Sequence, residues 1–430
     1  MKYLKNTSWL FLEKIFGMIL RLFIGVWVAR YLGPENFGLL SYSQSFVGLF
    51  ALLATMGLDG IVIRELVKAP DKKELLLGTS FILKIVGSFL MLSVLYIATT
   101  SLNHSEEIKL IILIIGCSSI FQSFHVIDFY FKSRVLSKYV VYASILSGII
   151  SNLIKVYLIL NKSSILYFAL NLLFDSVTMC IGLLHYFRLN GSSCFNWKFD
   201  YSLAISLFKD SYPRMLSGVV IAVYMKIDQV MLQEMIGSEA VGHYAAAVRL
   251  SLIWNFIPIA VCSSFFPALV KLKQECQKLY YSRLQKLYDL QFSMAFTIGL
   301  PIMFFSEDIT SFLYGGMYDS SGQILKVHIL CSFFVFMGVV RGNWIINENL
   351  QKYDMFIHII GAISNILFNY FFIKKYGVLG AAYGTVISYM FTLFFSSLLI
   401  KQIRPSFFMI IRGYYNILSL RFLRKGYFND

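Results

Sequence analysis

Long apolar stretches separated by short polar loops dominate the hydrophobic pattern of this chain. A helix that crosses a bilayer needs about 20 consecutive, mostly apolar residues. By that rule we predict twelve membrane-spanning helices, at residues 9–29, 38–58, 76–99, 109–130, 139–160, 164–187, 211–233, 244–270, 287–306, 323–346, 355–373 and 379–400.

The composition says which solvent surrounds these helices. Hydrophobic residues make up 58% of the 430 residues, charged residues make up 14%, and the mean hydropathy is +0.69. A soluble protein is typically about 45–50% apolar and about 25% charged. So much apolar surface cannot be hidden from water, which excludes a soluble enzyme, a disordered protein and a secreted disulfide scaffold. The sequence predicts an all-α polytopic membrane protein.

The basic residues predict the orientation in the membrane. Roughly two dozen lysines and arginines fall in the tails and loops of one side and about five on the other, which marks the first side as cytoplasmic. An even number of spans then places both termini in the cytoplasm. The first stretch carries charged residues and no small-residue cleavage site, so we interpret it as an uncleaved helix. Most of the basic residues behind the net charge of +15 lie in these loops and tails. We therefore attribute the positive charge to membrane orientation and exclude a nucleic-acid partner.

The end of the chain has a different pattern. After Pro405, aromatic residues interleave with arginine and lysine as far as Lys425. Residues 401–430 are therefore predicted to form a basic amphipathic helix on the cytoplasmic face of the membrane, with a thirteenth span as the alternative.

A repeated turn suggests that the chain has two similar halves. Residues 33–38 and 237–242 both read G-x-E-x-x-G, they lie 204 residues apart, and each follows the first helix of its half. Six spans separate them, so the halves have the same orientation and pack as two six-helix bundles about a pseudo-two-fold axis along the membrane normal. The alternative is a chance match of two glycine-containing turns. The predicted organisation is an N-terminal bundle at 1–190, a cytoplasmic linker at 191–210, a C-terminal bundle at 211–400 and a tail at 401–430.

Ionisable residues inside the spans are the candidate functional residues. A charge at the bilayer centre costs roughly 2.5–3.5 kcal/mol on insertion scales, so it usually faces a cavity or a partner. Basic residues outnumber acidic ones at membrane depth, which favours an anionic ligand with phosphate groups that arginine can grip bidentately. The candidates for substrate binding are Arg21, Lys155, Arg214, Arg249, Arg341 and Asp228. The candidates for coupling to a proton or sodium ion are His125, Asp128 and Asp175, with Asp228 as a further one.

Helical spacing predicts which polar residues share a face. The expected faces are Ser144, Gly148, Ser151 and Lys155 in one helix, Gln122, His125 and Asp128 in a second, and His358, Asn365 and Asn369 in a third. In the last predicted span, small residues recur every four positions from Gly380 to Ser396, which is typical of close helix packing.

Alternatives remain open for these residues. Lys84, Lys155 and Lys326 lie off-centre and have stems long enough to reach an interface. Arg214, Arg249 and Arg341 have a structural alternative, pairing with Asp128, Asp175 or Asp228, and His125 has the alternative of a core histidine.

Several chemistries have no support in the sequence. It contains no G-x-x-x-x-G-K-[ST], H-E-x-x-H or G-x-S-x-G motif, and the predicted outer loops are short. The six cysteines are scattered, without disulfide or metal-ligand spacing. We therefore predict no enzymatic activity, no catalytic residue, no cofactor and no metal site.

Five segments in order resemble the motifs of one family. They are Arg30–Gly38 (RYLGPENFG), Gly57–Glu65, Ile227–Leu232 with the glycines and Tyr244 after it, Phe266–Leu269 (FPAL) and Gly377–Thr385 (GVLGAAYGT). The chain resembles the polysaccharide repeat-unit flippases (Wzx-type O-antigen or capsule translocases) of the multidrug/oligosaccharidyl-lipid/polysaccharide exporter superfamily. The resemblance covers nearly the whole chain, and only Asp228 of the candidate residues falls inside a family-like motif.

The resemblance implies a function in polysaccharide biosynthesis. Such flippases move an oligosaccharide repeat unit of O-antigen, lipopolysaccharide or capsule, carried on undecaprenyl pyrophosphate, across the bacterial cytoplasmic (inner) membrane. They use alternating access, which we expect here through a cationic central cavity. The implied partners are the lipid-linked oligosaccharide, membrane lipids and other polysaccharide-assembly membrane proteins.

Two other function classes are weighed against this one. A multidrug exporter of the same superfamily is disfavoured because a cavity for cationic drugs needs an excess of acidic residues. A membrane glycosyltransferase or polymerase is disfavoured because no outer loop is long enough for a catalytic domain.

Overall fold

The fold is helical throughout the part of the chain that the structure describes. A computed structural model describes residues 2–419, with side chains from Gly17 onward except at positions 19, 417 and 418. No strand occurs within residues 2–419, which confirms the all-α prediction. The chain divides into two compact units, Met1–Lys226 (unit 1) and Ile227–Asp430 (unit 2). The division falls inside one helix, and the linker predicted at 191–210 stays a prediction.

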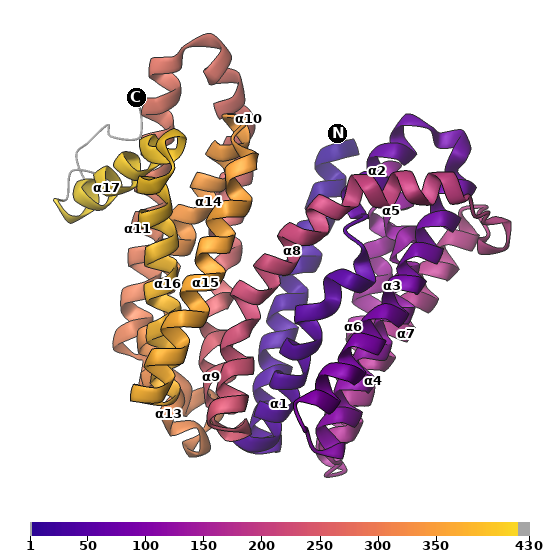
Figure 1. Ribbon diagram of the computed structural model, residues 1–430, viewed down its shortest axis with the longest axis horizontal. Helices are drawn as coiled ribbons and strands as arrows, with labels where there is room; N and C mark the ends of the chain where they lie inside the picture. Colours follow the sequence, from indigo (N-terminus) through magenta and orange to yellow (C-terminus); the bar gives the residue numbers. More distant parts are fainter. Residues whose placement is uncertain (1, 420–430) are drawn as a thin grey trace. The chain divides into compact units, whose positions relative to one another are not determined.

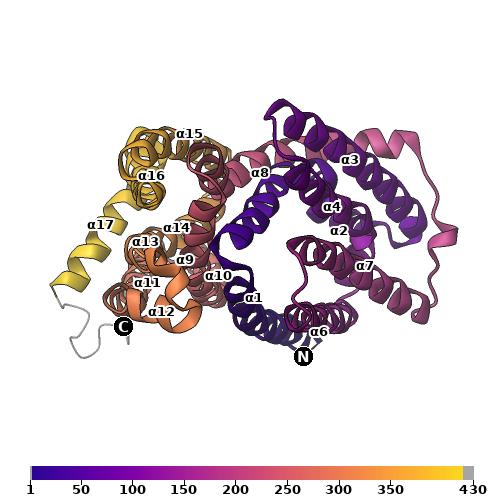
Figure 2. The same cartoon turned by 90° about the horizontal axis from the view of Figure 1, so that it is seen from below.

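Unit 1 is a bundle of long helices with short helices at one end (Figure 1). Its elements are α1 (Lys2–Thr55), α2 (Asp59–Lys68), η1 (Pro70–Lys72), α3 (Lys73–Ser101), α4 (Glu106–Gln122), η2 (Ser123–His125), α5 (Val126–Ser133), α6 (Lys138–Leu160), α7 (Ile165–Leu189), η3 (Cys194–Asn196) and the first part of α8 (Tyr201–Met235). Viewed along the bundle, α1, α3, α4, α7 and α6 follow one another in a ring, each packed on the next (Figure 2).

Unit 2 contains the rest of α8 and the remaining helices. They are α9 (Ser238–Leu252), η4 (Ile253–Asn255), α10 (Phe256–Glu275), α11 (Gln277–Phe304), α12 (Ser306–Tyr314), η5 (Gly316–Tyr318), α13 (Asp319–His328), α14 (Cys331–Asn347), α15 (Gln351–Tyr376), α16 (Val378–Leu399), η6 (Lys401–Ile403) and α17 (Arg404–Leu418). Apolar side chains of α10, α11, α14 and α17 form its core, which includes Phe292, Phe336, Trp344 and Ile410.

The predicted spans agree with the helices, although the helices are less regular. Among the described residues, ten helices are long and apolar enough to cross a membrane, or eleven if the bent pair Gly316–His328 and Cys331–Asn347 is one span. The first two predicted spans both lie in α1, which joins two helices across a break at Gly33. Three predicted spans are interrupted: 109–130 by η2, 244–270 by η4 and 323–346 by the turn between α13 and α14.

The repeated turn has a similar backbone in both halves. Gly33 has φ 70° and ψ 171°, and Gly237 has φ 127° and ψ −179°. Only glycine adopts these angles without strain, because a Cβ would clash with the neighbouring carbonyl. The turns therefore match in conformation as well as in sequence, which argues against a chance resemblance.

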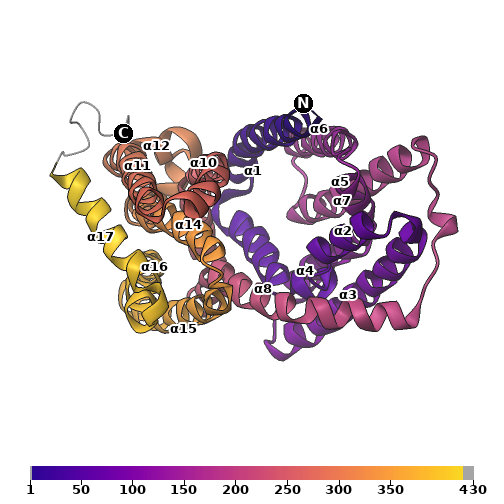
Figure 3. The ribbon, with the colours of Figure 1, turned by 90° about the horizontal axis from the view of Figure 1, so that it is seen from above.

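The small residues of α16 pack closely against α15, as their spacing predicts. A Cβ on Gly380 would lie 2.0 Å from the Phe372 carbonyl oxygen, and a Cβ on Gly384 would lie 2.2 Å from Asn369 Oδ1. These separations are far shorter than any van der Waals contact, so only glycine permits the approach. α15 and α16 consequently lie side by side in both end views (Figures 2 and 3).

The tail forms the predicted amphipathic helix as far as the structure describes it. One face of α17 packs on α11, where Gln285 Nε2 donates to the Met409 carbonyl at 3.0 Å and Asn416 Nδ2 to Asp289 Oδ2 at 3.2 Å. Phe408 and Tyr415 are exposed on another face. The last part of the predicted tail, residues 420–430, lies outside the described residues.

The repeated turns give a prediction for stability. Gly33→Ala and Gly237→Ala should each destabilise the fold by about 1–3 kcal/mol, because alanine at these angles is strained. Gly338→Ala in α14 is the control, since Gly338 is helical and a Cβ there meets nothing within 4 Å; alanine should stabilise that helix by about 0.5–1 kcal/mol. The measurement is the melting temperature of the purified proteins in detergent. Equal melting temperatures for Gly33→Ala and wild type would contradict the assignment of strain.

Candidate functional site

Unit 1 contains a polar cavity that brings four of the candidate residues together. It is about 260 Å³ in volume, and Arg21, His125, Lys155 and Asp175 all line it. We call it the Arg21 cavity. These residues come from α1, η2, α6 and α7, so the cavity exists only because four separate elements converge.

Two of these side chains provide the positive charge. Arg21 is exposed, and its Nε donates to the Gly17 carbonyl one turn earlier at 2.9 Å, so that its guanidinium lies over Gly17 at the edge of the cavity. Lys155 Nζ lies 3.4 Å from Asn152 Oδ1. The polar stripe predicted for α6 lines the same cavity, with Ser144, Gly148 and Ser151 as well as Lys155. A phosphate group in this cavity would meet one arginine and one lysine.

Asp175 is the residue that this cavity shares with a second one. Its Oδ1 accepts a hydrogen bond of 2.8 Å from Ser147 Oγ, which also lies 2.7 Å from Thr178 Oγ1. Asp175 therefore has its orientation fixed by α6. The second cavity, of about 290 Å³, is lined on its other sides by α1, α3 and α4.

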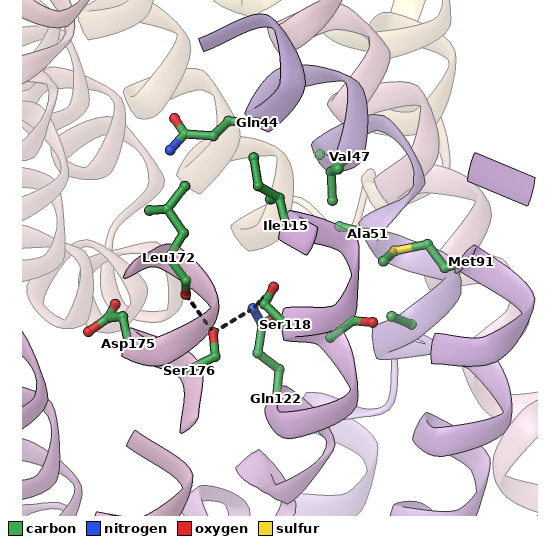
Figure 4. Close-up of a pocket in the computed structure, with 13 residues that line it drawn as sticks. Gln44, Val47, Ala51, Met91, Ile115, Ser118, Gln122, Leu172, Asp175 and Ser176 are labelled. Carbon is green, nitrogen blue, oxygen red and sulfur yellow. Dashed lines mark hydrogen bonds between the residues drawn. The ribbon is translucent and has the colours of Figure 1, made fainter. Parts of the chain in front are cut away.

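We call this second space the Gln122 cavity (Figure 4). Gln122 Nε2 donates to Ser118 Oγ at 3.1 Å and to Ser176 Oγ at 3.4 Å. Its lining residues are Gln44, Val47, Gly48, Ala51, Ala54, Met91, Ile115, Ser118, Ser119, Gln122, Leu172, Asp175 and Ser176. Apart from Asp175, every residue in this set is neutral.

Three other polar residues of unit 1 do not line either cavity. Asp128 Oδ2 pairs with Lys132 at 2.7 Å, while its buried Oδ1 has no hydrogen-bond partner among the described residues. Arg214 is exposed on α8 and lies against Gly60 of α2. Lys84 is only 4% exposed and lies 5.1 Å from the Phe129 ring, so it does not reach an interface as the alternative for it supposed.

The side chains of Gln122, His125 and Asp128, which we expected on one face, have different surroundings. Gln122 lines one cavity, His125 lines the other and Asp128 pairs with Lys132. The 3₁₀ turn η2 (Ser123–His125) lies between the helices that carry Gln122 and Asp128.

Unit 2 holds a buried carboxylate with neutral partners. Asp228 is 6% exposed. Its Oδ1 accepts from Asn369 Nδ2 at 2.6 Å, and its Oδ2 accepts from Tyr244 OH at 2.9 Å and Thr385 Oγ1 at 3.0 Å. Asn369 also donates to Asn365 Oδ1 at 3.0 Å, which adds a second amide to the cluster. The predicted face of α15 thus has Asn365 and Asn369 directed at α8, whereas His358 lies 3.7 Å from Asp354.

The two candidate arginines of unit 2 lie away from Asp228. Arg341 is 7% exposed, and its Nη1 donates to the Leu393 carbonyl at 3.0 Å and to Ser397 Oγ at 3.2 Å on α16. Arg249 is half-buried on α9, close to Tyr314 and Tyr318. Arg341 therefore links α14 to α16. These hydrogen bonds are consistent with a role in helix packing and with a role in ligand binding.

Sequence reasoning missed part of each site. Gln44 and Ser119 are neutral, so a search for charges in spans passes over them. Tyr244 and Thr385 lie 141 residues apart and meet at Asp228 only through the packing of α9 and α16. Among the described residues there is no group of three or more His, Cys, Asp or Glu side chains that could hold a metal ion.

Comparisons with known proteins agree with this architecture. A putative O-antigen transporter of Shigella flexneri is 24% identical over 409 residues, covering 89% of this chain and 94% of the relative. An inward-facing MATE family multidrug resistance transporter of the MOP superfamily superposes with a TM-score of 0.75 at 14% identity, covering 94% of this chain and 95% of the other. The lipid II flippase MurJ in an inward closed conformation gives a TM-score of 0.71 at 15% identity, covering 98% and 93%.

At such low identity the two solved structures show the fold alone, which is all-helical in each case. The apolar helices and the similarity to membrane transporters show that this chain is a multi-pass membrane protein. The profile described as "Polysaccharide biosynthesis protein" matches residues 3–273, well over half of the chain. The chain therefore belongs to the polysaccharide biosynthesis protein family.

Proposed function

We propose that this protein is a flippase that moves undecaprenyl-pyrophosphate-linked oligosaccharide repeat units across the bacterial inner membrane. Membership of the polysaccharide biosynthesis family gives the biological process. The observation that carries the ligand class is the Arg21 cavity, where a guanidinium and an ammonium group line one space inside a bundle otherwise faced by lipid. The protein acts as a transporter, and we assign no catalytic residue to it.

The charge of the cavity explains why a pyrophosphate can leave the membrane surface. Moving an unpaired anion into a medium of low dielectric constant is very costly, so the anion needs compensating charge along its path. Arginine presents a fork of donors that matches two phosphate oxygens, and lysine adds a compact positive charge. Arg21 and Lys155 supply one of each, while the lipid tail remains in the bilayer.

The other three candidate arginines also have a role in this proposal. Arg249 and Arg341 lie in unit 2 and Arg214 on the part of α8 in unit 1. We propose that they provide further positive charge along the path during alternating access, in which one bundle moves against the other. We also propose that both termini lie in the cytoplasm, as the distribution of basic residues predicts, and that other polysaccharide-assembly proteins act as partners.

The multidrug-exporter alternative is less compatible with the cavities. A cationic drug would require an excess of carboxylates, and Asp175 is the one carboxylate that lines either described cavity. Ser147 already donates to Asp175, and Arg21 and Lys155 line the same space. The local charge therefore favours an anion.

Asp228 has the geometry best suited to a coupling ion among the four candidates. An ionised carboxylate in an apolar interior is costly unless something neutralises it, and the hydrogen bonds found here all come from neutral groups. A proton on the carboxylate, or a sodium ion held by Asp228 and the oxygens of Asn365 and Thr385, would neutralise it. We propose that binding and release of such an ion at Asp228 drives transport, while Asp128, Asp175 and His125 remain candidates for a pathway in unit 1.

The charge of Arg21 gives the first functional prediction. Arg21→Glu should abolish surface polysaccharide in cells that lack the wild-type gene, because a carboxylate there repels the pyrophosphate. Arg21→Lys should keep partial activity. Lys162→Glu, an equal change of charge in an exposed loop, is the control and should be active. The measurement is surface polysaccharide per cell together with the amount of protein in the membrane. Full activity in a normally inserted Arg21→Glu protein would contradict the proposed path.

The coupling proposal is tested on purified protein. A ligand present at 100 times its dissociation constant stabilises a protein by about 2.7 kcal/mol, so either sodium or a fall in pH should raise the melting temperature of the wild type. Asp228→Asn keeps the volume and removes the titratable group, so its melting temperature should respond to neither. Asp308→Asn, an exposed position on α12, should behave as wild type. An Asp228→Asn protein that responds like wild type would show that the coupling ion binds elsewhere.

A further inference from the structure

The lining of the Gln122 cavity is unsuited to a phosphate group, because it carries hydrogen-bonding groups and no positive charge. Its polar lining consists of two amides, three serine hydroxyls and one carboxylate, and its volume is about 290 Å³. No lysine or arginine belongs to this lining. The cavity therefore offers many hydrogen bonds of both directions and no positive charge.

One polar group in this lining has no hydrogen-bond partner among the described residues. Ser119 is 5% exposed, and its Oγ has no hydrogen-bond partner among the described residues. A buried hydroxyl left unpaired costs about 1–3 kcal/mol, so this position is destabilised until a ligand or water pairs with it. Gln122 is already held by Ser118 and Ser176, and Gln44 lies on α1 at the opposite end of the lining (Figure 4). The arrangement resembles a binding site built in advance.

The position of the cavity relative to the Arg21 cavity limits what the ligand can be. Asp175 lines both, so a ligand with its phosphates near Arg21 and Lys155 has its next chemical group beside Asp175. In a lipid-linked oligosaccharide, the group next to the pyrophosphate is a sugar. We propose that the Gln122 cavity binds this first sugar, with Gln44, Ser119 and Gln122 as the residues that hydrogen-bond its hydroxyl or acetamido groups. This inference rests on the proposed function.

The lining suits a sugar in two respects. A sugar ring carries hydroxyls that donate and accept, as do the serines and glutamine amides here, and Asp175 can accept from two of them. It also has an apolar face of C–H groups, for which Val47, Met91, Ile115 and Leu172 supply the apolar wall. A small cation is a poorer occupant, because it would fill little of this volume.

The test compares a lipid with and without the sugar. The probes are polyprenyl diphosphate and the same lipid carrying one N-acetylglucosamine, N-acetylgalactosamine, glucose or galactose, titrated into the detergent-purified full-length protein. We expect wild type to bind at least one glycosylated probe about three- to tenfold more tightly than the bare diphosphate, the gain typical of one or two added hydrogen bonds. Gln122→Met and Gln44→Met should remove this preference and leave the affinity for the bare diphosphate unchanged.

Two further variants distinguish a failure of the sugar-site proposal from a failure of the proposed flippase function. Arg21→Gln should weaken the binding of all five probes, because it acts on the diphosphate. Gln351→Met, the same change at an exposed position of α15, should alter nothing. If wild type binds none of the probes, the proposed function fails, and the sugar site fails with it.

Other outcomes overturn the sugar site alone. Equal affinity of wild type for the bare and all glycosylated probes would show that no sugar is recognised, while the flippase proposal stands. A preference that survives in Gln122→Met and Gln44→Met would place the sugar elsewhere. A sodium-dependent rise in melting temperature that Asp175→Asn abolishes would identify the occupant as a cation.

Discussion

The structure depends on one constraint. A charged or hydrogen-bonding group that faces lipid loses its hydration, which raises its free energy. The backbone meets this constraint by forming helices in most of residues 2–419, joined by short turns and loops. Side chains meet it by turning inward, and the consequence is visible in both units. In unit 1, polar residues of α1, α4, α6 and α7 gather around two adjoining cavities. In unit 2, they form the closed hydrogen-bonded cluster at Asp228. Large apolar side chains such as Phe89 and Tyr157 are exposed on the outside.

The two units accommodate their polar groups differently, which suggests that they bind different kinds of ligand. Unit 1 leaves cationic and neutral polar groups lining open space, which suits a bulky ligand with phosphates and sugars. Unit 2 encloses its carboxylate among neutral donors, which suits a proton or a single small ion. α8 belongs to both units, and its last residue in unit 1 lies two positions before Asp228. Under the proposed function, an ion bound at Asp228 would lie on the helix that continues from one unit into the other.

The sequence predicts much of this because hydrophobicity is a local property. The apolar stretches fall in helical regions, although three of them are interrupted and two lie mostly in α1. The small residues from Gly380 onward pack as their spacing indicates, and the stripe ending at Lys155 lines one cavity. Other features depend on packing that spacing does not reveal. Gln122 and His125 line different cavities, and the packing around Lys84 buries a lysine that has the length to reach an interface. The cluster at Asp228 draws on four helices far apart in sequence.

The most direct test of the account is the distribution of lipid-linked oligosaccharide between leaflets. Proteoliposomes with the purified protein, and liposomes without it, would be loaded with undecaprenyl-pyrophosphate oligosaccharide, and the fraction accessible to an external glycosidase would be followed over time. The account predicts that the accessible fraction rises with time only when the protein is present, and that it rises more slowly with Arg21→Glu. A fraction that stays constant with correctly folded wild-type protein, in the presence of either a proton or a sodium gradient, would contradict the claim that this protein is a flippase.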